Sequence, residues 1–340
     1  MAFRNRVYIG VLRLLLLAGL SHPAVAEPPR IVIALPGPNV APYLPVELMS
    51  RIGADRRAGF VLVTRYFGGG PLAAKDMLER NSDFAGLGMP ALAGLRVDNP
   101  ELVSIAALTQ RPAYVLMARR GAKQVRGIAD LRGRDIGTHS GSKQGKSTAR
   151  QLAEYLLHRN GVGLDEVNFV NAGQSLVDYS AALRAGMVDA IMVNEPAATL
   201  LEQRKLAWRL ADLHDPEVAR KQLGGRFLYT QLATSKDTLR RQPDKARRLS
   251  TALRDTLGWM AKHSADDIVA RLALPEGEEK RALARFLAAH KDIYSPNGAF
   301  GAEAMRNSEA FFHAVSRDHS AAGRLRYASF VDDRWSGRGR

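Results

Sequence analysis

Residues 182–196 read ALRAGMVDAIMVNEP and place a helix end, a short turn, an apolar strand and a polar loop in direct succession. Residues 77–88, MLERNSDFAGLG, follow the same order with a turn that differs in length by one residue. A short apolar run that ends at polar residues, glycine or proline is typical of a strand buried on both faces, as in a parallel sheet. Because this unit occurs twice, the sequence predicts two α/β lobes built alike.

Further strands and helices alternate in the same way along the chain. The apolar run at residues 31–35 stops at Pro36-Gly37-Pro38-Asn39, as a buried strand that ends in a loop does. Residues 114–118 and 135–138 also indicate strands. After a strand that starts from residue 226 and reads FLYTQLAT the sequence is mostly helical, so we expect the last third to pack back onto the first lobe.

These elements predict a division of the chain into two discontinuous lobes joined by two crossings. Lobe II is the inserted segment, and the crossings would serve as hinges. The expected boundaries are residues 27–114 with 227–333 for lobe I, 115–226 for lobe II, 111–117 and 227–233 for the hinges, and 334–340 for a disordered basic tail.

The first 26 residues have the three parts of an export signal. Arg4, Arg6 and Arg13 form the basic part, residues 14–20 are apolar, and Ala-Val-Ala at 24–26 is a cleavage site. The alternative is a membrane anchor, but about 20 apolar residues are needed to span a bilayer and this run is shorter. We therefore expect cleavage after residue 26 and a periplasmic protein.

Composition excludes several kinds of chemistry. The 340 residues contain no cysteine, which excludes disulfides, thiol nucleophiles, lipidated cysteines and cysteine zinc sites. The eight histidines form no i, i+3 or i, i+4 pair, so we expect no metal and no cofactor. The formal charge is +15, and it is +12 after loss of the three arginines of the signal. Such an excess suggests nucleic acid or an anionic membrane, but the basic run at residues 240–248 has no interleaved aromatic residues.

Two segments match catalytic signatures only in part. Gly145-Lys146-Ser147 ends like a phosphate-binding loop, but the first glycine of that motif is replaced by Ser140. Residues 140–143 read SGSK, as in penicillin-recognising enzymes, yet the partner motifs S-D-N and K-T-G are absent. We expect no catalytic residues and no enzymatic activity.

Small and polar residues gather in the loops that follow the predicted strands. In open α/β sheets, ligands bind outside the carboxyl ends of strands, so these loops would meet at a cleft between the lobes. The loop at residues 140–144 is the strongest candidate, because glycine allows close backbone approach, and serine hydroxyls and helix N-terminal amides favour an anion. The same serines could instead cap the following helix.

Several candidate residues have two interpretations. Lys143 and Arg111 would add positive charge to the cleft or be solvated. Glu195 is either the first-turn acid of the next helix or an acceptor for a ligand amine or hinge contact. Tyr43 could stack on a ligand or belong to the core. The predicted ligand-binding residues are Asn39, Tyr43, Gly69, Gly70, Met89, Gln110, Arg111, Ser140, Gly141, Ser142, Lys143, Gln144, Gln174, Asn194 and Glu195.

The motifs together resemble a known family. LPGPNVAPYLP, FGGG, DFAGLG, IADLRGRDIGTHSGS, ALRAGMVDAIMVNEPAA and FLYTQLATSKDTL are similar to segments of the periplasmic binding proteins for nitrate, sulfonate and taurine, the NMT1/THI5-like group that also binds thiamine-precursor pyrimidines. The resemblance covers residues 31–270. It implies a type II periplasmic binding protein fold with ligand contacts at residues 68–70, 140–142 and 195–196.

The chain departs from the family in two respects. Ser140 stands where members often have proline, and Lys143 is not required by the family. Related pyrimidine-synthesising enzymes use a cysteine-rich motif, which this chain lacks. These differences leave the ligand open.

The resemblance implies an exported solute-binding protein that captures a small anionic solute, such as a sulfonate, nitrate or carboxylate. It would deliver the solute to an ABC permease at the inner membrane, act as a monomer and bind no nucleic acid. The alternative is an interaction protein that binds polyanions or cell surfaces through its basic charge.

Overall fold

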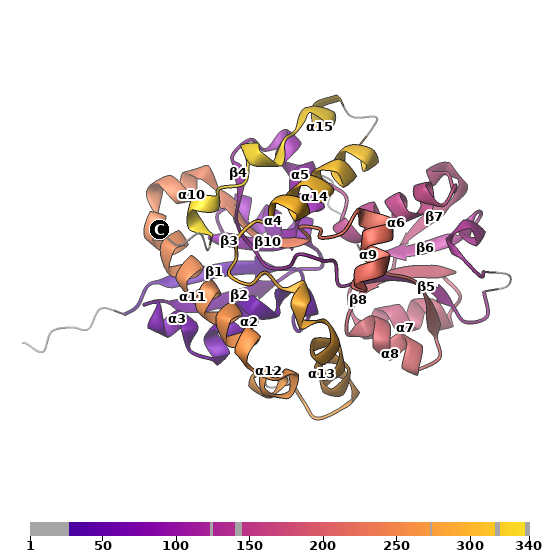
Figure 1. Ribbon diagram of the computed structural model, residues 1–340, viewed down its shortest axis with the longest axis horizontal. Coiled ribbons are helices and arrows are strands. Elements are labelled where there is room, and N and C mark those ends of the chain that lie inside the picture. Colours follow the sequence, from indigo (N-terminus) through magenta and orange to yellow (C-terminus); the bar gives the residue numbers. More distant parts are fainter. Residues whose placement is uncertain (1–26, 123–124, 140–144, 273, 317–319, 337–340) are drawn as a thin grey trace, which may run out of the picture.

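The computed structural model describes residues 27–122, 125–139, 145–272, 274–316 and 320–336, and these form two α/β lobes side by side (Figure 1). The predicted export signal lies outside the described residues. Each lobe contains one five-stranded mixed sheet with apolar clusters on both faces. Among the described residues, no helix has the length and apolarity that a membrane span requires.

The first sheet has the order β2-β1-β3-β10-β4. Strand β1 pairs in parallel with β2 and β3, whereas β10 runs antiparallel to β3 and β4. Strands β3 and β4 are buried along their whole length, as expected for a sheet covered on both faces. The bounds are β1 (Arg30–Leu35), β2 (Val61–Tyr66), β3 (Phe84–Gly88), β4 (Leu102–Ala107) and β10 (Thr230–Ser235).

The second sheet has the order β7-β6-β8-β5-β9 and repeats this arrangement. Strand β6 is parallel to β7 and β8, and β5 runs antiparallel to β8 and β9. In each sheet, the antiparallel strand is the one that follows a crossing from the other lobe. The bounds are β5 (Tyr114–Arg119), β6 (Asp135–Thr138), β7 (Asn168–Asn171), β8 (Ala190–Asn194) and β9 (Ala207–Asp212). This shared topology is that of the type II periplasmic binding protein fold.

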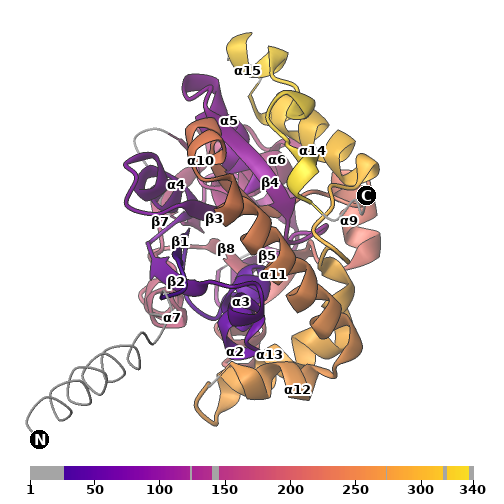
Figure 2. The ribbon, with the colours of Figure 1, turned by 90° about the vertical axis from the view of Figure 1, so that its left-hand side faces the viewer.

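Helices cover both sheets, and the longest, α11, lies along the first lobe beside α2 and α3 (Figure 2). The helices of the first lobe are α2 (Leu44–Arg51), α3 (Ala54–Arg57), α4 (Gly70–Leu78), α5 (Met89–Asp98), α10 (Lys236–Arg241), α11 (Pro243–Lys262), α12 (Ala265–Arg271), α13 (Glu278–His290), α14 (Ala302–Val315) and α15 (Ser320–Arg324). Those of the second are α6 (Thr148–Arg159), α7 (Leu176–Arg184), α8 (Ala197–Gln203) and α9 (Pro216–Leu223).

Helix α14 contacts the cores of both lobes. Its Phe311 packs among residues of the second lobe, edge-on to Phe227 with ring centroids 5.2 Å apart. The next residue, Phe312, packs in the first lobe near Tyr327. Opening of the lobes therefore has to change the contacts of α14 on one side or the other.

Three local features differ from the sequence expectation. The strand predicted from residue 226 begins only at Thr230, because the amides of Phe227 and Tyr229 donate to Gln110 and Thr109 in the neighbouring crossing. Strands β4 and β9 are absent from the sequence prediction. In the segment predicted as a disordered tail, Trp335 lies in a short 3₁₀ helix and packs against the first core.

Candidate ligand-binding site

A cavity of about 270 Å³ lies between the two lobes. The first lobe contributes the loop at residues 36–40 together with Tyr43, Gly70 and Gly88. The second lobe contributes its own loops and helix ends. Because both lobes form its walls, the cavity exists in this form only while they are in contact. The residues from the second lobe are Tyr114, His139, Ser147, Thr148, Gln174, Ser175, Leu176, Tyr179, Asn194, Glu195, Pro196, Ala197 and Leu200, and Pro71, Ala91, Tyr229 and Glu279 complete the lining.

Four helices of at least nine residues begin at this cavity. Gly70 begins α4, Thr148 begins α6, Leu176 begins α7, and Ala91 lies in the first turn of α5. Helix N-termini carry unpaired amide groups and partial positive charge, so they favour an anion. Helices α4 and α5 offer fewer amides than the other two, because Pro71 and Pro90 have no N–H and the Met89 amide donates to the Tyr229 carbonyl at 2.6 Å. The remaining N-terminal amides favour an anion, whereas the carboxylates of Glu195 and Glu279 in the same lining oppose one.

Serine caps hold two of these helices in place. Ser147 Oγ accepts the Arg150 amide at 3.3 Å, and Ser175 Oγ accepts the Asp178 amide at 3.1 Å. Asp178 in turn accepts from the Ser175 hydroxyl at 2.7 Å, and this hydrogen bond is the main cause that lowers the pKa of Asp178. The caps therefore serve the helices directly, while both serines also line the cavity.

Aromatic hydroxyls and one histidine form the polar wall of the cavity. The two ring nitrogens of His139 lie 3.1 Å from the Tyr114 hydroxyl and 2.8 Å from the Tyr179 hydroxyl. Tyr229 donates to Oδ1 of Asn194 at 2.9 Å. Burial lowers the pKa of His139 to about 4, so its ring is neutral at pH 7.

The lobes meet tightly where Gly88 at the end of β3 faces Thr148 at the start of α6. A Cβ atom on Gly88 would lie 2.8 Å from Thr148 Cβ and still nearer to its hydroxyl oxygen. Thr148 is 6% exposed, and its hydroxyl has no hydrogen-bond partner among the described residues. A second contact between the lobes is the ion pair of Arg204 in α8 with Glu278 in α13.

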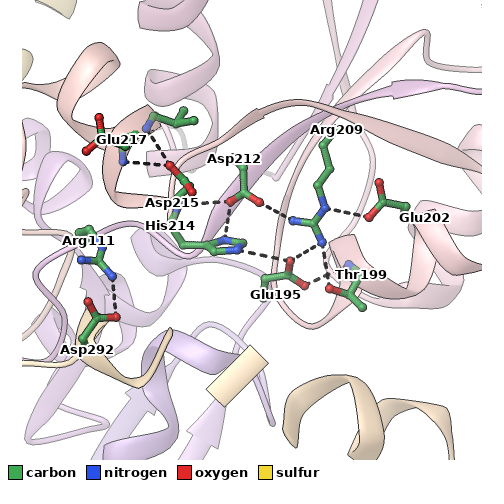
Figure 3. Close-up of polar contacts among 11 residues, drawn as sticks. Arg111, Glu195, Thr199, Glu202, Arg209, Asp212, His214, Asp215, Glu217 and Asp292 are labelled. Carbon is green, nitrogen blue, oxygen red and sulfur yellow. Dashed lines mark hydrogen bonds and ion pairs between the residues drawn. The ribbon is translucent and has the colours of Figure 1, made fainter. Parts of the chain in front are cut away.

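Glu195 lines the cavity, but its carboxylate is held by the protein (Figure 3). One oxygen lies 2.8 Å from Arg209, and the other accepts the Thr199 amide of α8 at 3.0 Å. Arg209 also pairs with Glu202 and Asp212 at 2.9 and 2.7 Å. Burial alone would lower the pKa of Arg209, but the charges of Glu195 and Asp212 raise it. Glu195 thus makes the contacts of a first-turn acid.

The predicted site residues fall into three groups. Those that line the cavity are Asn39, Tyr43, Gly70, Gln174, Asn194 and Glu195. Four lie outside the lining: Gly69 precedes α4, Met89 is fully buried, Gln110 accepts from Arg226 at 2.6 Å, and Arg111 pairs with Asp292 at 2.6 Å near the crossing (Figure 3). Ser140, Gly141, Ser142, Lys143 and Gln144 lie outside the described residues.

Sequence reasoning missed the aromatic wall. Tyr114 is the first residue of β5, and Tyr229 directly precedes β10. Both strands run antiparallel to their neighbours, so their amino ends, and not their carboxyl ends, face the cavity. A search for ligand contacts only at the carboxyl ends of strands therefore misses both tyrosines. His139 follows β6 and does obey that rule. The position of His139 directly after a strand is therefore the one sequence signal for this wall of the cavity.

Glu47 holds the loop that carries Asn39. Its Oε1 accepts the Asn39 amide at 2.9 Å, and burial raises the pKa of Glu47 to about 7 in spite of this bond. The folded protein therefore keeps a proton on Glu47 that the unfolded chain, with a pKa near 4.5, releases. The contribution of Glu47 to the free energy of unfolding is therefore fully present below pH 4.5 and is lost as the pH rises through 7.

We expect Glu47→Gln to raise the free energy of unfolding by about 1–3 kcal/mol at pH 8 and to change it little at pH 5. The glutamine keeps an oxygen for the Asn39 amide and carries no charge to bury. Urea denaturation at the two pH values measures this difference. An equal effect at both values would contradict the assignment of a buried, protonated carboxyl.

The chain is similar to known proteins in both sequence and structure. The sequence profile of the family described as NMT1/THI5 like matches residues 63–266. The Bacillus subtilis (strain 168) protein YtlA, named as a binding protein, is 21% identical over 228 residues, which are 66% of this chain and 65% of YtlA. The match thus spans less than two thirds of that relative.

Two solved structures share the fold over nearly their whole length. A protein of Bordetella bronchiseptica RB50 has a TM-score of 0.78 at 20% identity, with 90% of this chain and 95% of that chain covered. The alkanesulfonate-binding protein SsuA from Xanthomonas axonopodis pv. citri, bound to MOPS, has a TM-score of 0.71 at 19% identity, with 91% and 100% covered. Because the family profile matches more than half of the sequence, the chain belongs to the NMT1/THI5-like family.

Proposed function

We propose that the protein is an exported binding protein that captures a small organic anion between its lobes and delivers it to an ABC permease at the inner membrane. One observation carries this proposal: a cavity lined by both lobes, at which four helices begin. The membership of the NMT1/THI5-like family supports it, as does the fold shared with an alkanesulfonate-binding protein.

The size of the cavity favours an organic solute. An engineered protein cavity of about 150 Å³ holds benzene, and this cavity is about 270 Å³. An inorganic ion such as nitrate would leave most of that space to water. A sulfonate or carboxylate with a carbon skeleton would place its charged group at the helix N-termini and its apolar part against the proline and tyrosine side chains.

A binding role also accounts for the charged groups better than catalysis does. Both nitrogens of His139 are occupied by tyrosine hydroxyls, and Glu195 is committed to Arg209. Neither group is placed to exchange a proton with a substrate. Such a protein is useful only if the solute favours the closed form, so the solute has to contact both lobes.

The alternative of polyanion binding gains less support from the surface charges. Arg240 and Arg241 on α10 both contact Asp237, and Arg247 on α11 contacts Asp244. Acidic side chains thus interrupt the basic run on these helices. We also propose that the protein acts as a monomer in the periplasm.

A panel of solutes tests the proposed function on the mature chain, residues 27–340. We expect an alkanesulfonate or a carboxylate, at a hundred times its dissociation constant, to stabilise the protein by about 2.7 kcal/mol. Thermal unfolding with nitrate, sulfate, ethanesulfonate, taurine, benzoate and a pyrimidine measures the shift. If the melting temperature stays constant with every one of them, the proposed function is wrong.

A further inference from the structure

Tyr179, His139 and Tyr114 form a buried hydrogen-bonded chain in the wall of the cavity. The side chains are 3%, 6% and 4% exposed. The hydroxyl of Tyr179 lies 2.8 Å from Nε2 of His139, and that of Tyr114 lies 3.1 Å from Nδ1. The rings of His139 and Tyr179 are also stacked, with centroids 5.9 Å apart and planes inclined by 15°. The position of the imidazole is thus fixed from both sides.

The surroundings of His139 keep its ring uncharged. Burial alone accounts for its lowered pKa, and no acidic side chain of the described ranges bonds to either ring nitrogen. The groups that face the ring are Tyr114 from β5 and Tyr179 from α7, while the Ser147 hydroxyl at α6 donates to the backbone oxygen of His139 at 3.0 Å. All three are neutral.

A neutral imidazole has one N–H donor and one acceptor nitrogen, so the two tyrosines cannot both play the same part. With the hydrogen on Nδ1, His139 donates to Tyr114 and accepts from Tyr179, whose hydroxyl hydrogen then points away from the cavity. With the hydrogen on Nε2, His139 donates to Tyr179 and accepts from Tyr114. The Tyr179 hydroxyl hydrogen is then free to be donated to a solute.

We propose that His139 is a specificity-determining residue whose tautomer decides whether Tyr179 donates a hydrogen bond to the solute or accepts one. Binding of an anion selects the Nε2–H tautomer, because the anion needs a donor. The change moves one proton from Nδ1 to Nε2 through water, with no net uptake or release, and both hydroxyls rotate about their C–O bonds. This proposal rests on the proposed function in one respect, namely that the solute is an anion.

The first arm of the test needs no solute. Two variants of the mature chain, Tyr114→Phe and Tyr179→Phe, are labelled with ¹⁵N-histidine, and the ring nitrogen shifts are recorded at pH 7. Without the Tyr114 hydroxyl, Nδ1 has lost its partner, so the ring should carry its hydrogen on Nε2, where Tyr179 can accept it. Without the Tyr179 hydroxyl, Nε2 has lost its partner, so the hydrogen should be on Nδ1, where Tyr114 can accept it. We therefore expect opposite tautomers in the two variants. The same tautomer in both, or a cationic ring, would overturn the proposal.

The second arm adds ethanesulfonate and benzoate to the wild-type protein and to the same variants. A probe that binds should move His139 to Nε2–H, and Tyr179→Phe should weaken its binding roughly 10- to 100-fold. In Tyr114→Phe the ring should already carry its hydrogen on Nε2, so a probe that binds should leave the tautomer unchanged. Tyr155→Phe, which lies outside the cavity, should match wild type.

The outcomes separate the two proposals. A probe that binds and leaves the hydrogen on Nδ1 would refute the role of His139 while leaving the proposed function intact. If neither probe binds but the first arm gives opposite tautomers, the choice of solute in the proposed function fails and the tautomer control by the two tyrosines stands.

Discussion

Replacing Gly88 with alanine is expected to weaken solute binding roughly 5- to 150-fold while the protein stays folded. The backbone of Gly88, at φ −70° and ψ 141°, suits any residue, so alanine causes no strain there. Its Cβ would lie 2.8 Å from Thr148 Cβ across the contact between the lobes. Closure would therefore require a displacement that costs about 1–3 kcal/mol. Titration of the solute that gives the largest thermal shift measures the loss.

Two further variants distinguish a block to closure from a general defect. Gly94→Ala lies in the same lobe, and no atom of the residues that the structure describes lies within 4 Å of the added Cβ, so this variant should bind as wild type. Gly88→Ala combined with Thr148→Gly removes the opposing side chain and should recover part of the affinity. Equal binding by Gly88→Ala and wild type would show that this contact does not form in the bound state.

Replacing Arg209 with methionine is expected to lower the free energy of unfolding by about 3–5 kcal/mol. The side chain of Glu195 is 1% exposed, and Arg209 is the cation that pairs with it, at 2.8 Å. Without Arg209, the Glu195 carboxylate would remain buried with the Thr199 amide as its hydrogen-bond partner and His214 Nε2 at 4.0 Å. Urea denaturation measures the change, which is large against a typical stability of about 5–15 kcal/mol.

The control for this variant is Arg220→Met in the same lobe. Arg220 pairs with Glu217 on the surface, where an ion pair contributes about 0–1 kcal/mol. The double variant Glu195→Gln and Arg209→Met should be more stable than Arg209→Met, because it removes the charge that lost its partner. A double variant that is less stable would mean that Arg209 acts through Glu202 or Asp212 instead.

The sequence was sufficient to predict the fold because the local signals agree with it. The paired units at residues 77–88 and 182–193 are β3 and β8 with the helices before them, and they occupy the third position in their sheets. The 20-residue helix α11 lies in the last third of the chain, which the sequence predicts to be mostly helical. Strand β9 was missed, since its residues AWRLAD are only partly buried and lack a clear alternation.

The site was less predictable, because its walls depend on how the two lobes meet. Asn39, Gly70, Gln174 and Asn194 follow from their places in loops after strands or before helices. Tyr179 lies one turn inside α7, and no pattern in the sequence shows that this face of the helix meets His139. The loop at residues 140–144 stays a prediction.

The claim that a solute closes the two lobes is tested most directly by the distance between them. The chain has no cysteine, so Glu79→Cys and Arg184→Cys give one spin-label position on each lobe, at exposed sites. Double electron–electron resonance then compares the mature protein with and without the solute that stabilises it most. We expect the solute to replace a broad distribution by a shorter, narrow one. An unchanged distribution at saturating solute would contradict the account.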